Sequence, residues 1–292
     1  MCSGILLECP RLIYRLMCLP RIPGLKPNTV LLADNDRFQF MDDEALTYLV
    51  NWIYAPENRT NQFPVSYILL SERLGDTIPA IEAGQPIHQN FYLSDFRGST
   101  DQAIVVYFNP PSCLRVLNPA YDHGLVYLQV YRFMNGRVTI LDAFAQPPLA
   151  AAALPLSNMD QILPAPAHPA RPPSFIFDPE PSTNWCYFFE KADLARQTGN
   201  WQKVVSLGDE AFSGDYYPVD LSEYLVFIEG YARQGRLEDA ARLTSSISDA
   251  APVLNPALCA IWERARMAGQ LSENDEEQIT SIEQGLLCNS VR

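Results

Sequence analysis

The spacing of apolar residues divides the chain into two folded segments, and the first has the mixed pattern of an α/β domain. Short apolar runs bounded by turn residues, Thr29 to Ala33 and Ser66 to Ser71, are typical of buried strands. Between them, apolar residues recur at helical spacing from Asp42 to Tyr54, behind two aspartates that suit a helix start. This order predicts one β-α-β unit.

The rest of the first segment is typical of antiparallel strands. We expect Asn90 to Leu93 and Ala103 to Phe108 to form a hairpin around the polar residues 95–101. A strand is expected at residues 114–117, and a second hairpin around Asn135-Gly136. Residues 29–146 therefore predict a small mixed α/β domain. We expect one core to contain these residues: Leu31, Val50, Ile68, Val105 and Val116.

After residue 184 the apolar period changes to that of amphipathic helices. Three pairs of helical stripes are each interrupted by a glycine, at Gly199, Gly235 and Gly269. These glycines are 36 and 34 residues apart, close to the tetratricopeptide period. Residues 184–288 therefore predict tetratricopeptide-like helical repeats with a glycine near each turn. The predicted fold class is α+β multidomain, a mixed α/β domain followed by an all-α repeat domain.

Two segments are expected to lie outside these domains. Ten prolines fall between Pro147 and Pro181, so residues 147–183 are interpreted as a linker that either wraps over a surface or spaces the domains. Residues 1–28 are apolar but broken by prolines and arginines, and are interpreted as a stub, a fragment or a juxtamembrane segment. The sequence contains no apolar run of about eighteen residues that would span a bilayer.

The charge balance argues against nucleic acid as a partner. The formal net charge is −13, and lysine occurs only three times. A surface that follows phosphates needs the opposite balance. An acidic chain favours solubility and basic partners instead.

The seven cysteines favour neither a metal site nor a simple disulfide framework. There is no C-x-x-C and no histidine at metal-ligand spacing, so no structural zinc is expected. Cys259 and Cys288 lie on helical apolar stripes and are expected to be buried free thiols. Cys113 and Cys186 flank the proline-rich segment, and either a disulfide in an oxidising compartment or two free thiols fits that position.

Candidate chemistry is sparse. Asp34 and Asp36 follow the first strand, where paired carboxylates could hold a cation against a phosphate, although a solvated loop explains them as well. Asp95 and Arg97 lie in the predicted hairpin tip and form a second candidate polar site. No nucleotide-binding, zinc-protease or serine-hydrolase motif is present. No catalytic residue, metal ligand or cofactor is therefore assigned.

Several segments resemble a family of membrane proteins. They are residues 184–197, 227–232, 51–56, 97–100 and 111–117. They are similar to the soluble carboxyl-terminal region of large bacterial membrane proteins akin to dolichyl-phosphate-mannose-type glycosyltransferases. In that family the catalytic carboxylates lie on a loop between membrane helices, so no catalytic residue carries over. The resemblance implies a domain on the extracytoplasmic face, beside a membrane-embedded parent or partner.

These observations give two functional expectations. The first is a non-catalytic extracytoplasmic accessory domain, whose helical repeats bind a protein or peptide or brace the α/β domain. The alternative is a sugar- or phosphate-processing enzyme with its site near Asp34 and Asp36. A cleft with convergent carboxylates would favour the alternative.

Overall fold

The structure is a computed structural model, and its described residues fall into two compact units. The residues described are 22–34, 42–58, 60–107, 112–122, 131–134, 137–140, 149–171, 184–269 and 272–288. The first unit contains those up to Tyr121 together with residues 131–171, and the second contains Asp122 and residues 184–288. A mixed α/β region is thus followed by a helical region, as the sequence predicts at this level.

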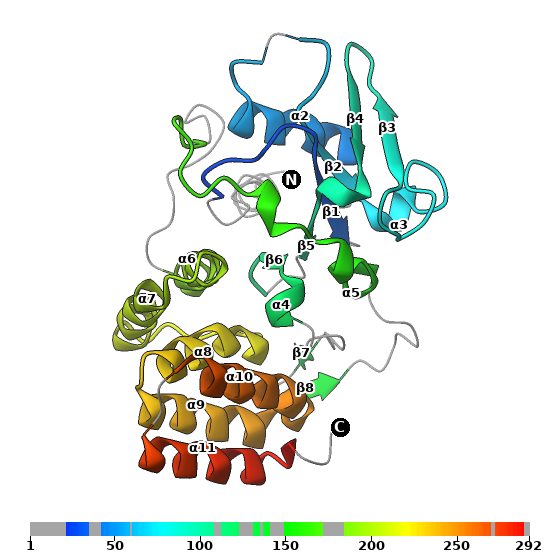
Figure 1. Ribbon diagram of the computed structural model, residues 1–292. Coiled ribbons are helices and arrows are strands. Elements are labelled where there is room, and N and C mark those ends of the chain that lie inside the picture. The colour runs from blue at the N-terminus through cyan, green and yellow to red at the C-terminus, as the bar shows by residue number, and fades with distance from the viewer. Residues whose placement is uncertain are drawn as a thin grey trace, which may run out of the picture. The chain divides into compact units, whose positions relative to one another are not determined.

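The first unit is built on a four-stranded sheet in the order β2-β1-β5-β6 (Figure 1). Its strands are β1 (Thr29–Asp34), β2 (Val65–Leu69), β5 (Ala103–Tyr107) and β6 (Arg115–Leu117). Strand β1 runs parallel to β2 and β5, whereas β6 is antiparallel to β5. Helix α2 (Asp43–Tyr54) connects β1 with β2, and the Asp42 side chain caps its first turn. The predicted β-α-β unit is confirmed.

The sheet is buried on both faces, and successive side chains of each strand point alternately into two separate clusters. Leu31, Val50 and Val116 belong to the cluster on the face that α2 covers. Ile68 and Val105 belong to the cluster on the other face. The expectation of a single shared core is therefore wrong. Ile68 and Val105 both pair with Leu32 of β1, whose side chain points to the face opposite α2.

A hairpin of β3 (Pro86–Asn90) and β4 (Asp95–Ser99) contributes to the second face. The predicted hairpin around residues 95–101 is wrong, since these residues include a strand and the chain reverses earlier. Phe96 explains the error: it is fully buried and anchors β4, although its neighbours in sequence are polar. Strand β5 pairs instead with β1.

Parts of the two segments expected outside the domain are folded into it. Ile22 and Leu25 belong to the cluster beneath α2, so part of the predicted stub contributes to the core. Helix α5 (Leu149–Ala153) places Ala150 and Ala153 in the opposite cluster. Small alanine side chains allow this close packing, and residues 149–171 thus follow the surface-wrapping alternative. The expected boundaries at 29 and 146 are narrower than the folded unit.

Side chains of α2 protect the outer edge of β2. Thr47 Oγ accepts a hydrogen bond from the Tyr67 amide at 3.0 Å and donates to its carbonyl at 3.2 Å. Asn51 accepts from the Val65 amide at 3.2 Å and donates to its carbonyl at 2.6 Å. An edge strand otherwise leaves such groups open to pairing with another chain. Two buried polar residues of the helix therefore close this edge.

The remaining short elements of the described chain are mostly single turns. They are α3 (Leu70–Arg73), η1 (Thr100–Gln102), α4 (Pro119–Asp122), η3 (Leu154–Leu156) and η4 (Met159–Gln161). Strands β7 (Tyr131–Met134) and β8 (Arg137–Ile140) form an antiparallel pair. This pair agrees with the predicted second hairpin, whose Asn135-Gly136 tip lies outside the described residues.

The second unit consists of consecutive helices joined by short connections (Figure 1). Its helices are α6 (Trp185–Gln197), α7 (Trp201–Ser213), η5 (Leu221–Tyr224), α8 (Leu225–Arg233), α9 (Leu237–Ala250), η6 (Pro252–Leu254), α10 (Asn255–Ala268) and α11 (Glu273–Gly285). Gly199 lies between α6 and α7 and Gly235 between α8 and α9, each with positive φ. Gly269 caps α10 before α11. All three glycines thus lie at helix connections, as expected.

Two other glycines allow α7 and α8 to pack closely. A β-carbon built on Gly230 of α8 would lie 2.5 Å from a methyl group of Val204 on α7. One built on Gly208 of α7 would lie 2.8 Å from both the Phe227 ring and the Tyr231 hydroxyl on α8. Larger side chains at either glycine would push the two helices apart.

Candidate functional site

The structure does not bring the predicted polar residues together. Asp34 ends β1, at the carboxyl end of the sheet. Asp95 exchanges backbone hydrogen bonds with Asn61 and Phe63, just before β2 begins, at the amino end. The length of β1, about 17 Å at the usual rise per residue, separates these ends. Asp36 lies outside the described residues.

Asp95 and Arg97 do lie side by side on β4, but they form a surface ion pair. Arg97 Nε donates to Asp95 Oδ2 at 2.9 Å, and the Arg97 side chain is 69% exposed. His88 on the paired strand places Nε2 3.5 Å from the same oxygen. Exposed pairs of this kind contribute about 0.2–1 kcal/mol to stability. Nothing in this arrangement converges on a reacting atom.

A pocket of about 410 Å³ lies among α7, η5, α8 and α9 in the helical unit. Its volume is within the usual range for small-ligand sites. We call it the aromatic pocket, and its lining includes Phe212, Tyr217, Tyr224, Tyr231, Arg242 and Ser246. The Phe212 ring is nearly parallel to those of Tyr217 and Tyr224, with ring centroids 6.4 and 6.0 Å away. Stacked aromatic pairs stabilise one another, so these rings give the pocket an apolar lining held in place.

An ion-pair network forms the polar wall of the aromatic pocket. Arg236 donates to both carboxylate oxygens of Asp209, at 2.8 and 2.6 Å, and to Asp239 at 2.8 Å. Its guanidinium lies 4.5 Å from the centroid of the Tyr231 ring, a cation–π distance. Tyr231 donates its hydroxyl hydrogen to Asp209 at 2.9 Å. Burial, and then this hydrogen bond, raise the pKa of Tyr231, so its hydroxyl remains a hydrogen-bond donor to Asp209 even at alkaline pH.

A second ion network is buried between helices α8 and α10. Glu229 of α8 is fully buried and accepts hydrogen bonds from Arg233 at 3.0 Å and from Arg264 of α10 at 2.9 and 2.8 Å. Burial alone would raise the pKa of Glu229, but the hydrogen bonds and charges of these arginines outweigh it and lower the pKa. The carboxylate therefore stays charged and links two helix pairs.

Arg196 of α6 forms a similar cluster within the same unit. Its guanidinium donates to Asp193 at 2.6 Å and to Asp122 at 3.3 Å. Burial would lower the pKa of Arg196, but the charges of Asp122 and Asp193 raise it. The arginine is thus a permanent buried cation held by two carboxylates.

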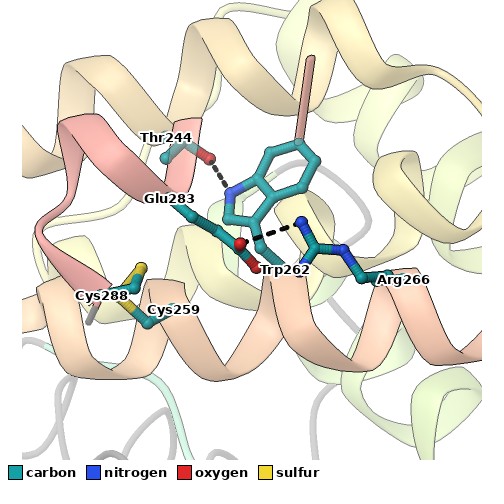
Figure 2. The surroundings of a disulfide bond; sticks show 6 residues. All are labelled: Thr244, Cys259, Trp262, Arg266, Glu283 and Cys288. Atoms are coloured by element: carbon teal, nitrogen blue, oxygen red, sulfur yellow. Dashed lines mark hydrogen bonds and ion pairs between the residues drawn. A yellow bond between two sulfur atoms is a disulfide. The ribbon is translucent and has the colours of Figure 1, made fainter. Parts of the chain in front are cut away.

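The cysteine pair of the last two helices differs from the prediction. Cys259 of α10 and Cys288, just after α11, form a disulfide with α-carbons 5.5 Å apart (Figure 2). The expected buried free thiols are therefore wrong, because the chain after α11 brings Cys288 against Cys259 of α10. Figure 2 also shows Arg266 paired with Glu283 at 2.9 Å, beside the buried Trp262. The disulfide thus joins contacts that hold α11 to α10.

The predicted Cys113–Cys186 disulfide would link the two units, and it stays a prediction.

Within the part of the chain that the structure describes, no group of three or more His, Cys, Asp or Glu side chains could hold a metal ion. Over the same residues, no helix is long and apolar enough to cross a membrane.

The aromatic pocket could not be predicted from the sequence. Phe212 and Tyr231 were visible only as members of apolar stripes, and such stripes usually indicate core. The residues that could have indicated the pocket are Tyr217, in the connection between α7 and α8, and Arg236, in the turn between α8 and α9. Aromatic residues outside a helical stripe can indicate a surface site when neighbouring turns carry charge.

Comparison with known proteins gave no relative. No protein-family model, curated protein or solved structure matches the chain.

Proposed function

We propose that this chain is a non-catalytic, extracytoplasmic protein-interaction domain, accessory to a glycosyltransferase-like membrane protein. The observation that carries the interaction role is the aromatic pocket. It lies on the helical unit, offers flat apolar rings, and is bordered by an ordered ion-pair wall. Sites that bind protein segments are enriched in tyrosine and arginine, as this pocket is.

The proposal also interprets the helical unit as tetratricopeptide-like. The supporting observations are the helix pairs α6–α7, α8–α9 and α10–α11, each joined near a glycine, and the spacing of 36 and 34 residues between those glycines. Repeats of this kind bury their apolar faces against neighbouring repeats and leave extended binding surfaces. The partner would then be a protein or peptide.

The extracytoplasmic location is supported by the Cys259–Cys288 disulfide and by the resemblance described above. Disulfides persist in oxidising compartments and are rare in the cytosol. The alternative, an enzyme with a site near Asp34 and Asp36, stays a prediction because Asp36 lies outside the described residues; Asp95, at the opposite end of the sheet from Asp34, does not contribute to such a site.

A site-specific photo-crosslinker tests the interaction role. We would place p-benzoylphenylalanine at Tyr217, which is 56% exposed, and at the matched control Tyr92, which is 91% exposed in the first unit. A discrete crosslinked adduct in cells is expected at position 217 and not at 92. Identical adducts at both positions, or none at 217, would contradict an interaction through the pocket.

A further inference from the structure

We propose that the aromatic pocket binds a proline-rich segment of its partner in the polyproline II conformation. This inference rests on the proposed interaction role and names the chemical class of the ligand. It is drawn from the groups that the pocket leaves available for a ligand.

The charges that line the pocket favour a neutral ligand. The two carboxylates of the pocket, Asp209 and Asp239, are both engaged by Arg236, and Asp239 also accepts from Arg242 at 2.7 Å. Two acidic and two basic side chains therefore balance within the pocket. A neutral ligand suits this balance, since a cationic one would have to compete with Arg236 for the carboxylates.

The polar groups that the pocket leaves for a ligand favour a hydrogen-bond acceptor. Among the described residues, the hydroxyls of Tyr224 and Ser246 have no hydrogen-bond partner, and the Arg242 side chain is 76% exposed. Arginine offers only donors, and the hydroxyls can donate as well. A proline-rich strand offers backbone carbonyl acceptors but few backbone N–H groups, because proline has none. The pocket and such a strand are complementary.

The aromatic rings of the pocket suit an extended ligand. Phe212, Tyr217 and Tyr224 form a ladder of near-parallel rings, and Trp185 packs behind it with its ring 6.0 Å from that of Phe212. The Trp185 indole is itself fixed by a hydrogen bond to Glu223 at 2.6 Å. Polyproline II segments bind to grooves lined by aromatic residues and lose little entropy, because they are already extended. The supported rings supply such a groove.

The test uses blocked octaproline as the probe, with a glycine–serine peptide of equal length and octa-arginine as comparisons, in titrations with the whole chain. Octaproline is expected to bind more tightly than the glycine–serine peptide, with little dependence on salt because the ligand is neutral. Tyr217→Ala should weaken it roughly tenfold, and Tyr92→Ala should leave it unchanged. Tyr224→Phe keeps the ring and removes the hydroxyl, so a smaller, roughly threefold loss is expected.

The outcomes separate this inference from the broader proposal. Octaproline binding no tighter than the glycine–serine peptide, or unaffected by Tyr217→Ala, overturns the proline-rich ligand. If octa-arginine binds instead and Tyr217→Ala weakens it, the ligand class is wrong while the interaction role stands. If neither peptide binds and the crosslinker at position 217 yields no adduct, both proposals fall. Circular dichroism of each variant checks that the helices remain folded.

Discussion

Breaking the Cys259–Cys288 disulfide is expected to loosen α11 more than any other part of the helical unit. Apart from the disulfide, α11 is anchored by few apolar side chains, with Ile279 buried on the helix and Leu286 just after it. Its ion pairs from Arg266 are partly exposed, and such pairs contribute about 0.2–1 kcal/mol each. The covalent link is therefore a large share of what holds the helix.

The size of the effect follows from the loop that the disulfide closes. The two cysteines are 29 residues apart, for which the chain-entropy relation gives about 3.6 kcal/mol at 25 °C. This is comparable to fully burying one or two aliphatic side chains. If the whole amount applies to the local opening of α11, hydrogen exchange of its amides should accelerate roughly 400-fold.

The assay compares the free energy of unfolding and the exchange of residues 273–285 in the wild type, Cys259→Ser, Cys288→Ser and the double variant. Either single substitution breaks the bond, so both single variants should match the double variant and the reduced wild type. Additive losses in the two single variants would show that packing of each sulfur, not the bond, stabilises α11. Unchanged exchange in α11 in all variants would refute the reasoning.

Other parts of the molecule give further predictions. Glu229→Gln should lower the free energy of unfolding by about 3 kcal/mol, the lower end for a broken buried pair, because its arginines keep some solvent contact. The pKa of Glu229 is lower in the folded state than its ordinary value of 4.5, so its contribution to stability is complete above about pH 4.5 and is lost as the pH falls through the folded-state pKa. The difference in free energy of unfolding between the wild type and Glu229→Gln, measured by urea titration, should therefore shrink as the pH falls below 4.5. Gly230→Ala should destabilise by about 1–3 kcal/mol in the same assay, since its β-carbon would meet a valine on α7, whereas Gly285→Ala, with no neighbour within 4 Å, should be neutral or slightly stabilising. The predicted Cys113–Cys186 disulfide should protect both cysteines from alkylation until reductant is added, and labelling of either without reductant, read by mass spectrometry, would contradict it.

Elements with a uniform pattern could be predicted from the sequence, and elements fixed by one residue or by distant contacts could not. Thr29 to Ala33 is a continuous apolar run, because a central parallel strand is covered on both faces. Strand β4 was missed because Phe96 alone anchors it, among polar neighbours whose side chains stay near solvent. Helix α5 was missed because prolines on either side suggested a linker, whereas its alanines pack on the sheet.

The candidate sites show the same limit. Asp95 and Arg97 were predicted in a hairpin tip, and they lie close together instead because they are two residues apart on one strand. Their distance from Asp34 depends on where the hairpin lies against the sheet, which local patterns do not encode. The aromatic pocket depends on a contact between Tyr217, in a connection, and Phe212 of the preceding helix. Helical periodicity in the sequence does not predict such a contact.

The way residues 22–28 and 149–162 close the first unit has a consequence for its synthesis. Leu25 bridges to Ile162, and the Ser157 hydroxyl and Asn158 amide bond to β5 backbone groups at Val105 and Ala103. A nascent chain therefore cannot complete this core until residue 162 has left the ribosome, although its strands emerge much earlier. In the second unit each helix pair packs on the next one along the chain, so each pair can be completed soon after its neighbour emerges. The amino-terminal unit is thus the one exposed longest to chaperones, and a fragment ending at residue 146 would remain in that incomplete state.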